Sequence, residues 1–243
     1  MVDPARSFDL AADEYERTRP DYPAEVLDAL PLGADADVLD LGAGTGKLTR
    51  ILVGRYRHVT AVEPLDGMRA ILERVVPEAE ALPGSAERIP LDDASVDGVF
   101  AAQAFHWFDH DVALPEIARV LRRGGVLCLV WNSGDETRPS PLPPDYVAYL
   151  EELHRESLSR VRAGTPWQEL IGRGPFGEVH EAKVPHDHVL DRAGLLDNAR
   201  SVSWIASLPD DQRQAVLAKL DSLLHDGTFA IPNVANVLWA VRE

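Results

Sequence analysis

Cysteine is almost absent from this sequence, in which Cys128 is the only one among 243 residues. A single cysteine excludes an intramolecular disulfide and a cysteine-rich zinc site. Because Cys128 lies within the apolar run VLCLV, we interpret it as a buried, unreactive thiol. No apolar run reaches the roughly 18 residues of a membrane-spanning helix, and residues 1–10 lack the apolar core of a signal peptide. We therefore expect a cytoplasmic protein without a membrane partner.

Positive charge is also scarce. Lysine and arginine number 24 and aspartate and glutamate 40, which gives a formal net charge of −16. Such a surface repels nucleic-acid phosphates, so we expect a small-molecule partner and no nucleic acid. Hydrophobic residues make up 45% of the chain, enough for one sizeable core. The sequence leaves the oligomeric state open.

The most informative stretch is VLDLGAGTG at residues 38–46. Its first residues form an apolar run typical of a buried strand, and Gly42, Gly44 and Gly46 then alternate before a helical pattern. Glycines permit positive φ and let the backbone approach a ligand closely, and the next helix offers free N–H groups. This order predicts a site for a nucleotide-like ligand.

Two details disfavour NAD as that ligand. The dinucleotide fingerprint is GxGxxG, whereas the third glycine here comes one residue earlier. Asp40 also precedes the glycines, where a carboxylate would repel a pyrophosphate but accept a cationic amino group. Glu63 follows the next predicted strand, where it can accept hydrogen bonds from both ribose hydroxyls. The pattern favours an amino-acid nucleoside over a dinucleotide and makes an NAD-dependent oxidoreductase the weaker reading.

Hydrophobic periodicity and turn residues predict alternating strands and helices in the first half of the chain. We expect helices at residues 8–18, 23–30, 46–56, 65–75, 111–122, 144–161 and 209–225, and strands at residues 36–41, 58–62, 78–82, 95–103, 126–131, 178–185 and 234–241. The helix at 111–122 would end at the Arg-Arg-Gly-Gly sequence 122–125. Successive strand–helix units of this length indicate a parallel sheet with right-handed crossovers.

Four ordered motifs resemble those of class I S-adenosylmethionine-dependent methyltransferases. They are VLDLGAGTG at 38–46, VEP at 62–64, GSAERIPLDDASVDGVF at 84–100 and EIARVLRRGGVL at 116–127. FDLAADEYERTRPDYP at 8–23 and AQAFHWF at 102–108 are similar to the type-11 group around trans-aconitate methyltransferase-like proteins. The similarity is close over residues 8–132 and loose beyond them.

The resemblance implies an α/β fold with a doubly wound, mostly parallel, seven-stranded sheet whose last strand is antiparallel. It also implies a helical cap inserted after strand five. We expect one methyltransferase domain over residues 1–243, with an N-terminal helical lid (1–31), a donor-binding core (32–132), a cap and acceptor region with a late strand (133–232) and a final strand (233–243).

The resemblance further implies that S-adenosylmethionine is the donor and S-adenosylhomocysteine the product. The residues expected around it are Tyr15, Arg19, Asp40, Gly42, Gly44, Gly46, Glu63, Pro64, Met68, Ser85, Ala86, Glu87 and Gln103. Asp40 would orient the donor amino group, directly or through water, and Glu63 would bind the ribose. Many relatives carry GDA where this chain has GSA, so Ser85 is a weaker acceptor for adenine. Glu87 is either a substitute acceptor or a surface acid.

On the acceptor side, we expect His106, Trp107, Trp131 and Trp204 to bind the substrate. His106 is the candidate general base, with a substrate-positioning or structural role as the alternative. His186 and His188 share one face of a strand without a third ligand, so we expect no metal. The predicted reaction is O-methylation of a carboxylate or hydroxyl of a small molecule. N- or C-methylation, or a module that only binds the donor, remains the alternative.

Overall fold

The computed structural model describes residue 16, residues 18–158 and residues 167–243. Seven strands form one sheet in the order β3-β2-β1-β4-β5-β7-β6. They are β1 (Asp37–Leu41), β2 (His58–Val62), β3 (Glu80–Leu82), β4 (Val96–Ala102), β5 (Leu121–Gly134), β6 (His180–Asp191) and β7 (Thr228–Val241). Strands β1 to β5 are parallel, and β7 is antiparallel to both of its neighbours. The predicted seven-stranded α/β sheet is confirmed.

Helices cover both faces of this sheet. The described helices are η1 (Ala24–Leu27), α3 (Thr49–Val53), α4 (Asp66–Val75), η2 (Phe105–Trp107), α5 (His110–Val120), α6 (Pro144–Leu158), α7 (Trp167–Ile171), α8 (Arg192–Ser201), α9 (Ser203–Ala206) and α10 (Asp210–Leu223). Strand residues alternate between two hydrophobic clusters: Leu39 packs with residues of α5 and α7, and Val38 packs with residues of η1 and α3. This alternation is the two-residue period of a strand that is buried on both faces.

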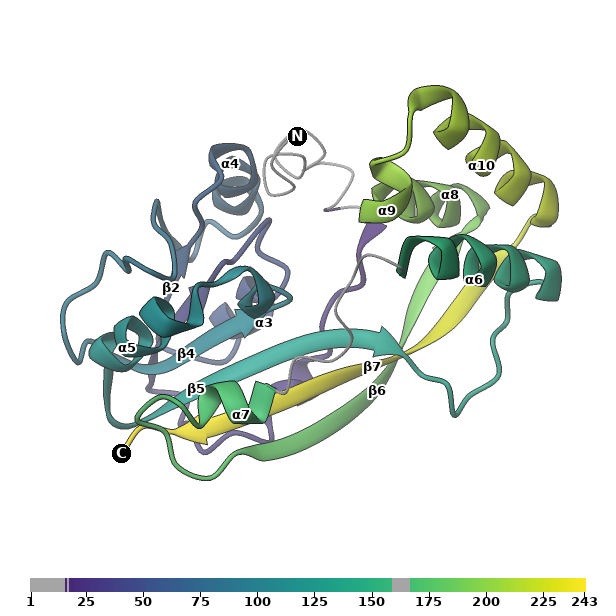
Figure 1. Ribbon diagram of the computed structural model, residues 1–243. Helices are drawn as coiled ribbons and strands as arrows, with labels where there is room; N and C mark the ends of the chain where they lie inside the picture. Colours follow the sequence, from purple (N-terminus) through teal and green to yellow (C-terminus); the bar gives the residue numbers. More distant parts are fainter. Residues whose placement is uncertain (1–15, 17, 159–166) are drawn as a thin grey trace.

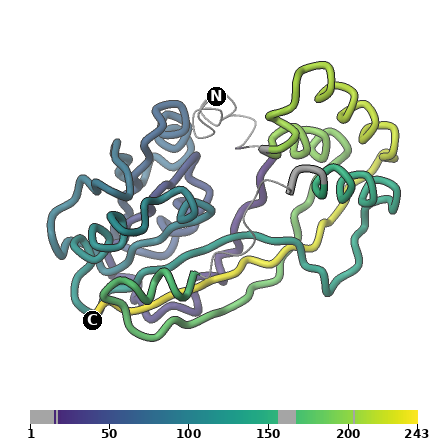
Figure 2. The backbone as a smooth tube through the Cα atoms, viewed as in Figure 1, coloured from purple at the N-terminus to yellow at the C-terminus, as the bar shows by residue number. Residues whose placement is uncertain are grey.

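Strands β5, β6 and β7 are unusually long, with 14, 12 and 14 residues against five in β1. Their pairing continues to Gly134–Asn233 and to Asp191–Thr228, well past the short parallel strands. The extension carries a separate helical layer of α6, α8, α9 and α10, which we call the cap (Figure 1). The cap has its own hydrophobic cluster, centred on Tyr146, Ile205 and Leu220. It stands apart from α3, α4 and α5 in the backbone trace (Figure 2).

Several element boundaries differ from the sequence prediction. The helix expected at 46–56 is only Thr49–Val53, because Gly46 at φ 90° keeps the turn irregular. The helix expected at 23–30 is a four-residue 3-10 helix. The helix expected at 111–122 ends at Val120, and β5 begins at once, with a register shift against β4 between Val96 and Gly98.

The cap differs most from expectation. Helices α8 and α9 were not predicted, and they follow β6 in the chain, so the cap is built from two separate stretches on either side of that strand. Strand β7 begins at Thr228, inside the segment 133–232 expected for the cap. The helix expected at 8–18 lies almost wholly outside the described residues.

No helix in residues 18–158 or 167–243 combines the length and the apolar character needed to cross a bilayer.

Candidate active site

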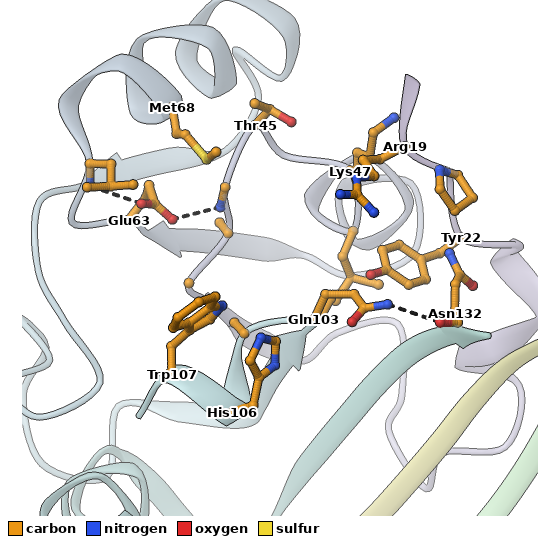
Figure 3. Close-up of a pocket in the computed structure, with 18 of the residues that line it drawn as sticks. Arg19, Tyr22, Thr45, Lys47, Glu63, Met68, Gln103, His106, Trp107 and Asn132 are labelled. Atoms are coloured by element: carbon orange, nitrogen blue, oxygen red, sulfur yellow. Dashed lines mark hydrogen bonds between the residues drawn. The ribbon is translucent and has the colours of Figure 1, made fainter. Parts of the chain in front are cut away.

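A cavity of about 680 Å³ lies beyond the carboxyl ends of the parallel strands. Ligands of open α/β sheets bind at this edge. One part of its wall comes from the turns after β1, β2 and β3, and another from η2, the end of β5, β6, α8 and β7. Thus the cavity lies between the turns at the ends of the parallel strands and the cap. Figure 3 shows part of its lining.

The glycine turn forms one side of the cavity. Gly42, Gly44 and Gly46 have φ of 71°, 58° and 90°, which side chains rarely adopt. A Cβ on Gly42 would also lie 2.7 Å from the Ala104 Cβ, whereas one on Gly44 would meet only the Met68 Sδ, at 3.7 Å. Gly42 and Gly44 line the cavity, and Gly44 leaves backbone open to it. Gly46 does not line it, and an added Cβ there would instead meet Val76 and Leu72 at 3.1 and 3.3 Å.

Glu63 joins this turn to the turn after β2. Its Oε2 accepts a hydrogen bond from the Gly44 N–H at 2.8 Å, and its Oε1 accepts one from the Leu65 N–H at 2.9 Å (Figure 3). The side chain lines the cavity although only 5% of the residue is exposed. Each carboxylate oxygen has further acceptor capacity beyond one bond. A fixed carboxylate at this point can accept two neighbouring hydroxyl donors.

Asp40 lies behind the glycine turn and is fully buried. Its Oδ2 accepts a hydrogen bond from the Thr49 hydroxyl at 2.7 Å, and its Oδ1 has no partner among the described residues. Burial raises the pKa of Asp40 to about 7 despite the Thr49 hydrogen bond, and the Glu63 carboxylate adds to the increase. Asp40 is not on the cavity wall, and its role in orienting the donor amino group, directly or through water, stays a prediction.

The turn with the sequence GSAE, after β3, contributes to the same side of the cavity as the glycine turn and Glu63. Ser85, Ala86 and Glu87 all line the cavity, together with Pro64 and Met68. Burial alone would raise the pKa of Glu87, but hydrogen bonds from the Asp109 N–H, at 2.9 Å, and from Ser85 lower it. Glu87 is therefore a carboxylate of the cavity wall, not merely a surface acid.

Gln103 marks the end of β4. It has a φ of 51°, unusual outside glycine, and its Nε2 donates to the Asn132 carbonyl at 3.1 Å (Figure 3).

His106 and Trp107 follow in η2 and line the cavity, with their ring centroids 4.8 Å apart. Desolvation lowers the pKa of His106, and Trp107 is 53% exposed. At neutral pH the imidazole is uncharged and can accept a hydrogen bond.

Several lining residues were not predicted: Tyr22, Lys47, Asn132, His188, Asn198 and Asn233. Asn132 lies near the carboxyl end of β5, and ligands of open α/β sheets bind at the carboxyl ends of the strands, so its position could have been predicted. The others come from segments without a recognisable motif.

Residues 18–22 cross from the core to the cap. The Thr18 carbonyl accepts hydrogen bonds from His188 Nε2 at 2.9 Å and from Asn198 Nδ2 at 3.2 Å. Arg19 lines the cavity, and its Nη2 donates to the Ser201 carbonyl at 2.9 Å. Thr18 and Arg19 are therefore attached to β6 and α8, while Tyr15 and most of the predicted lid lie outside the described residues.

Two tryptophans expected at the substrate do not line the cavity. Trp131 packs against the sheet core, and Trp204 packs in the cap with its ring stacked on His154 at 5.8 Å. Their side chains pack in these hydrophobic clusters, and their contact with a substrate stays an untested prediction. His186 and His188 are held by Asn132 and Thr18 respectively.

The methyltransferase domain family matches residues 39–129. An uncharacterized methyltransferase of Mycobacterium tuberculosis is 42% identical over 222 residues, covering 91% of this chain and 87% of that protein. The chain belongs to the methyltransferase family. A trans-aconitate 2-methyltransferase of Variovorax paradoxus is 28% identical, with 86% of this chain and 84% of that protein covered.

Solved structures agree on the fold. A candidate type II methyltransferase from Anaeromyxobacter dehalogenans superposes with a TM-score of 0.67 at 23% identity, covering 92% of this chain and 97% of the other. The predicted class I fold is thereby confirmed. The family match and the 42% identical relative confirm the predicted methyltransferase class, and S-adenosylmethionine is the donor.

Proposed function

We propose that this methyltransferase transfers a methyl group from S-adenosylmethionine to a carboxylate or hydroxyl oxygen of a small polar molecule. One observation carries the proposal: a single cavity joins the Gly44–Glu63 end, suited to a nucleoside, to the Gln103–His106–Asn132 end, which is polar. At about 680 Å³ it falls within the range of small-molecule sites.

The residues at the first end fit the donor. Glu63 is fixed by two backbone N–H groups and can accept the ribose hydroxyls. Met68 and Pro64 supply apolar surface for a purine, and the Ser85–Glu87 pair supplies acceptors for its exocyclic amine. Gly42 and Gly44, both with positive φ, expose backbone to the methionine part. S-adenosylmethionine supplies a methyl group on a sulfonium.

The second end suits an anionic or hydroxylated acceptor. Arg19 and Lys47 are cationic residues of the wall, although Arg19 also donates to Ser201 and Lys47 to Asp21, at 2.8 Å. A carboxylate oxygen attacks the methyl carbon, the sulfur–carbon bond breaks with its electrons moving to sulfur, and no proton is transferred. Holding the acceptor in line is then the main contribution of the chain. The names of a trans-aconitate 2-methyltransferase and a malonyl-[acyl-carrier protein] O-methyltransferase among the relatives support an oxygen acceptor.

His106 has a positioning role in this scheme. Its neutral imidazole lines the cavity beside Trp107, and a carboxylate acceptor needs no general base. His106→Gln is therefore expected to raise the KM for the acceptor while kcat stays within about tenfold, since general-base loss typically costs 10²–10⁴. A hundredfold loss of kcat in that variant would assign His106 to proton transfer.

The test uses the purified protein with methyl-labelled S-adenosylmethionine and a panel of small di- and tricarboxylates, hydroxy acids and amines. We expect labelled product from a carboxylate or hydroxyl acceptor, and base-labile label identifies a methyl ester. Base-stable label on an amine or carbon would contradict the oxygen acceptor. Tight S-adenosylhomocysteine binding without transfer to any acceptor would indicate a binding module.

A further inference from the structure

A second pocket lies beside α5, apart from the residues that line the active-site cavity. It has a volume of about 400 Å³ and lies between α5 and the turn after α7, close to the end of β7. Figure 1 shows α5, α7 and the C-terminus on the same side of the molecule. The wall consists of His110, Asp111, Leu114, Pro115, Ala118, Arg119, Arg173, Gly174, Pro175 and Arg242. None of these residues lines the active-site cavity.

The charge of this wall is opposite to that of the protein. Three arginines face one aspartate, in a chain whose formal net charge is −16. Arg119 is neutralised by Glu116 and Asp93, which pair with it at 2.8 Å. Arg173 and Arg242 form no ion pair with any described residue. Two uncompensated guanidinium groups therefore meet in one pocket.

Arg242 adds a second, independent observation. Its guanidinium donates through Nη1 to the Leu121 carbonyl, while its Nε is buried without a hydrogen-bond partner in the described part of the chain. The contact with the Leu121 carbonyl anchors the Arg242 side chain, which is part of the pocket wall. The planar guanidinium group of an arginine can donate two parallel hydrogen bonds to one phosphate or carboxylate group.

We propose that this pocket binds a small oxyanion, a phosphate or carboxylate group carried by a small organic molecule. Arg173 and Arg242 hold the anionic group, and Leu114, Pro115 and Pro175 contact its organic part. The volume lies in the range of small-ligand sites. The site is separate from methyl transfer, so its existence does not depend on the proposed function.

The experiment is a titration of the ¹⁵N-labelled protein with inorganic phosphate, and separately with succinate, at constant ionic strength. S-adenosylhomocysteine is present throughout to occupy the active-site cavity. We expect saturable shifts of the amide signals of Gly174, Arg173 and Arg119. Saturation by phosphate indicates a phosphorylated ligand, and saturation by succinate alone indicates a carboxylate.

The variant Arg173→Gln tests the charge without disturbing the core, because Arg173 is exposed. We expect it to weaken anion binding at least tenfold. Arg155→Gln is the matched control, an exposed arginine on α6 away from the pocket, and should bind as the wild type does. No saturable shift at these amides with either anion, or equal affinity in Arg173→Gln, would overturn the proposal.

Discussion

The two ends of the active-site cavity are held by contacts of very different reach along the chain. At the glycine end, Glu63 bonds to backbone 2 and 19 residues away, and Asp40 to a hydroxyl 9 residues away. At the cap end, Thr18 is bonded to residues 170 and 180 positions later. Contacts between residues close together in the chain form a recognisable sequence motif, whereas contacts between residues far apart in the chain do not.

The largest effect on stability and donor binding is expected from a substitution in the glycine turn. Gly42→Ala places a Cβ 2.7 Å from the Ala104 Cβ at a φ of 71°. Strain and overpacking together should lower the free energy of unfolding by about 2–4 kcal/mol and weaken S-adenosylhomocysteine binding more than tenfold. Denaturant unfolding and calorimetry measure the two effects. Gly124→Ala is the control, since Gly124 has a similar φ of 78° but no atom within 4 Å of its added Cβ and no place in the cavity wall, so donor affinity should not change.

The Glu63 carboxylate gives the next effect. Glu63→Gln removes the charge that accepts hydrogen bonds from backbone and ligand, so S-adenosylhomocysteine binding should weaken by about 2 kcal/mol. Glu73→Gln, an exposed residue of α4, should bind the donor as the wild type does. The KM for the acceptor should move little in either variant. Equal donor affinity in Glu63→Gln would remove the ribose role.

Asp40 predicts a pH dependence of stability. Its folded-state pKa of about 7 lies above the ordinary value of 3.8, so the folded protein binds the proton more tightly than the unfolded chain. Its contribution to stability is full below about pH 4 and is lost as the pH rises toward 7. Between pH 5 and pH 8 the wild type should therefore lose about 2 kcal/mol relative to Asp40→Asn. Denaturant unfolding of both proteins at the two pH values measures this, and parallel curves would contradict it.

The smallest effect is expected at the cap end of the cavity, on the KM for the acceptor. Asn198→Ala removes the hydrogen bond from α8 to the Thr18 carbonyl, worth about 1 kcal/mol. The KM for the acceptor should rise about fivefold while the affinity for S-adenosylhomocysteine stays unchanged. A variant that weakens the donor instead would show that the two ends are not separable in the way the contacts indicate.

The elements of the parallel sheet were predicted from the sequence much more accurately than those of the cap. Strand β2 was predicted to the residue and β1 within one, because buried strands and glycine turns have local signals. Helices α8 and α9 and the wall residues Asn198 and Asn233 were missed, since their positions depend on the long pairing of β6 with β7. Trp204 was placed at the substrate because it lies in the expected acceptor region, whereas in the structure its side chain packs in the cap cluster.

The central claim is that the donor occupies the glycine end with its reactive sulfur toward the polar end. A crystal structure with S-adenosylhomocysteine bound tests it most directly. The account predicts ribose hydroxyls within hydrogen-bond distance of the Glu63 carboxylate, with the sulfur facing Gln103 and His106. A ribose away from Glu63, or a sulfur turned away from the cap, would contradict it.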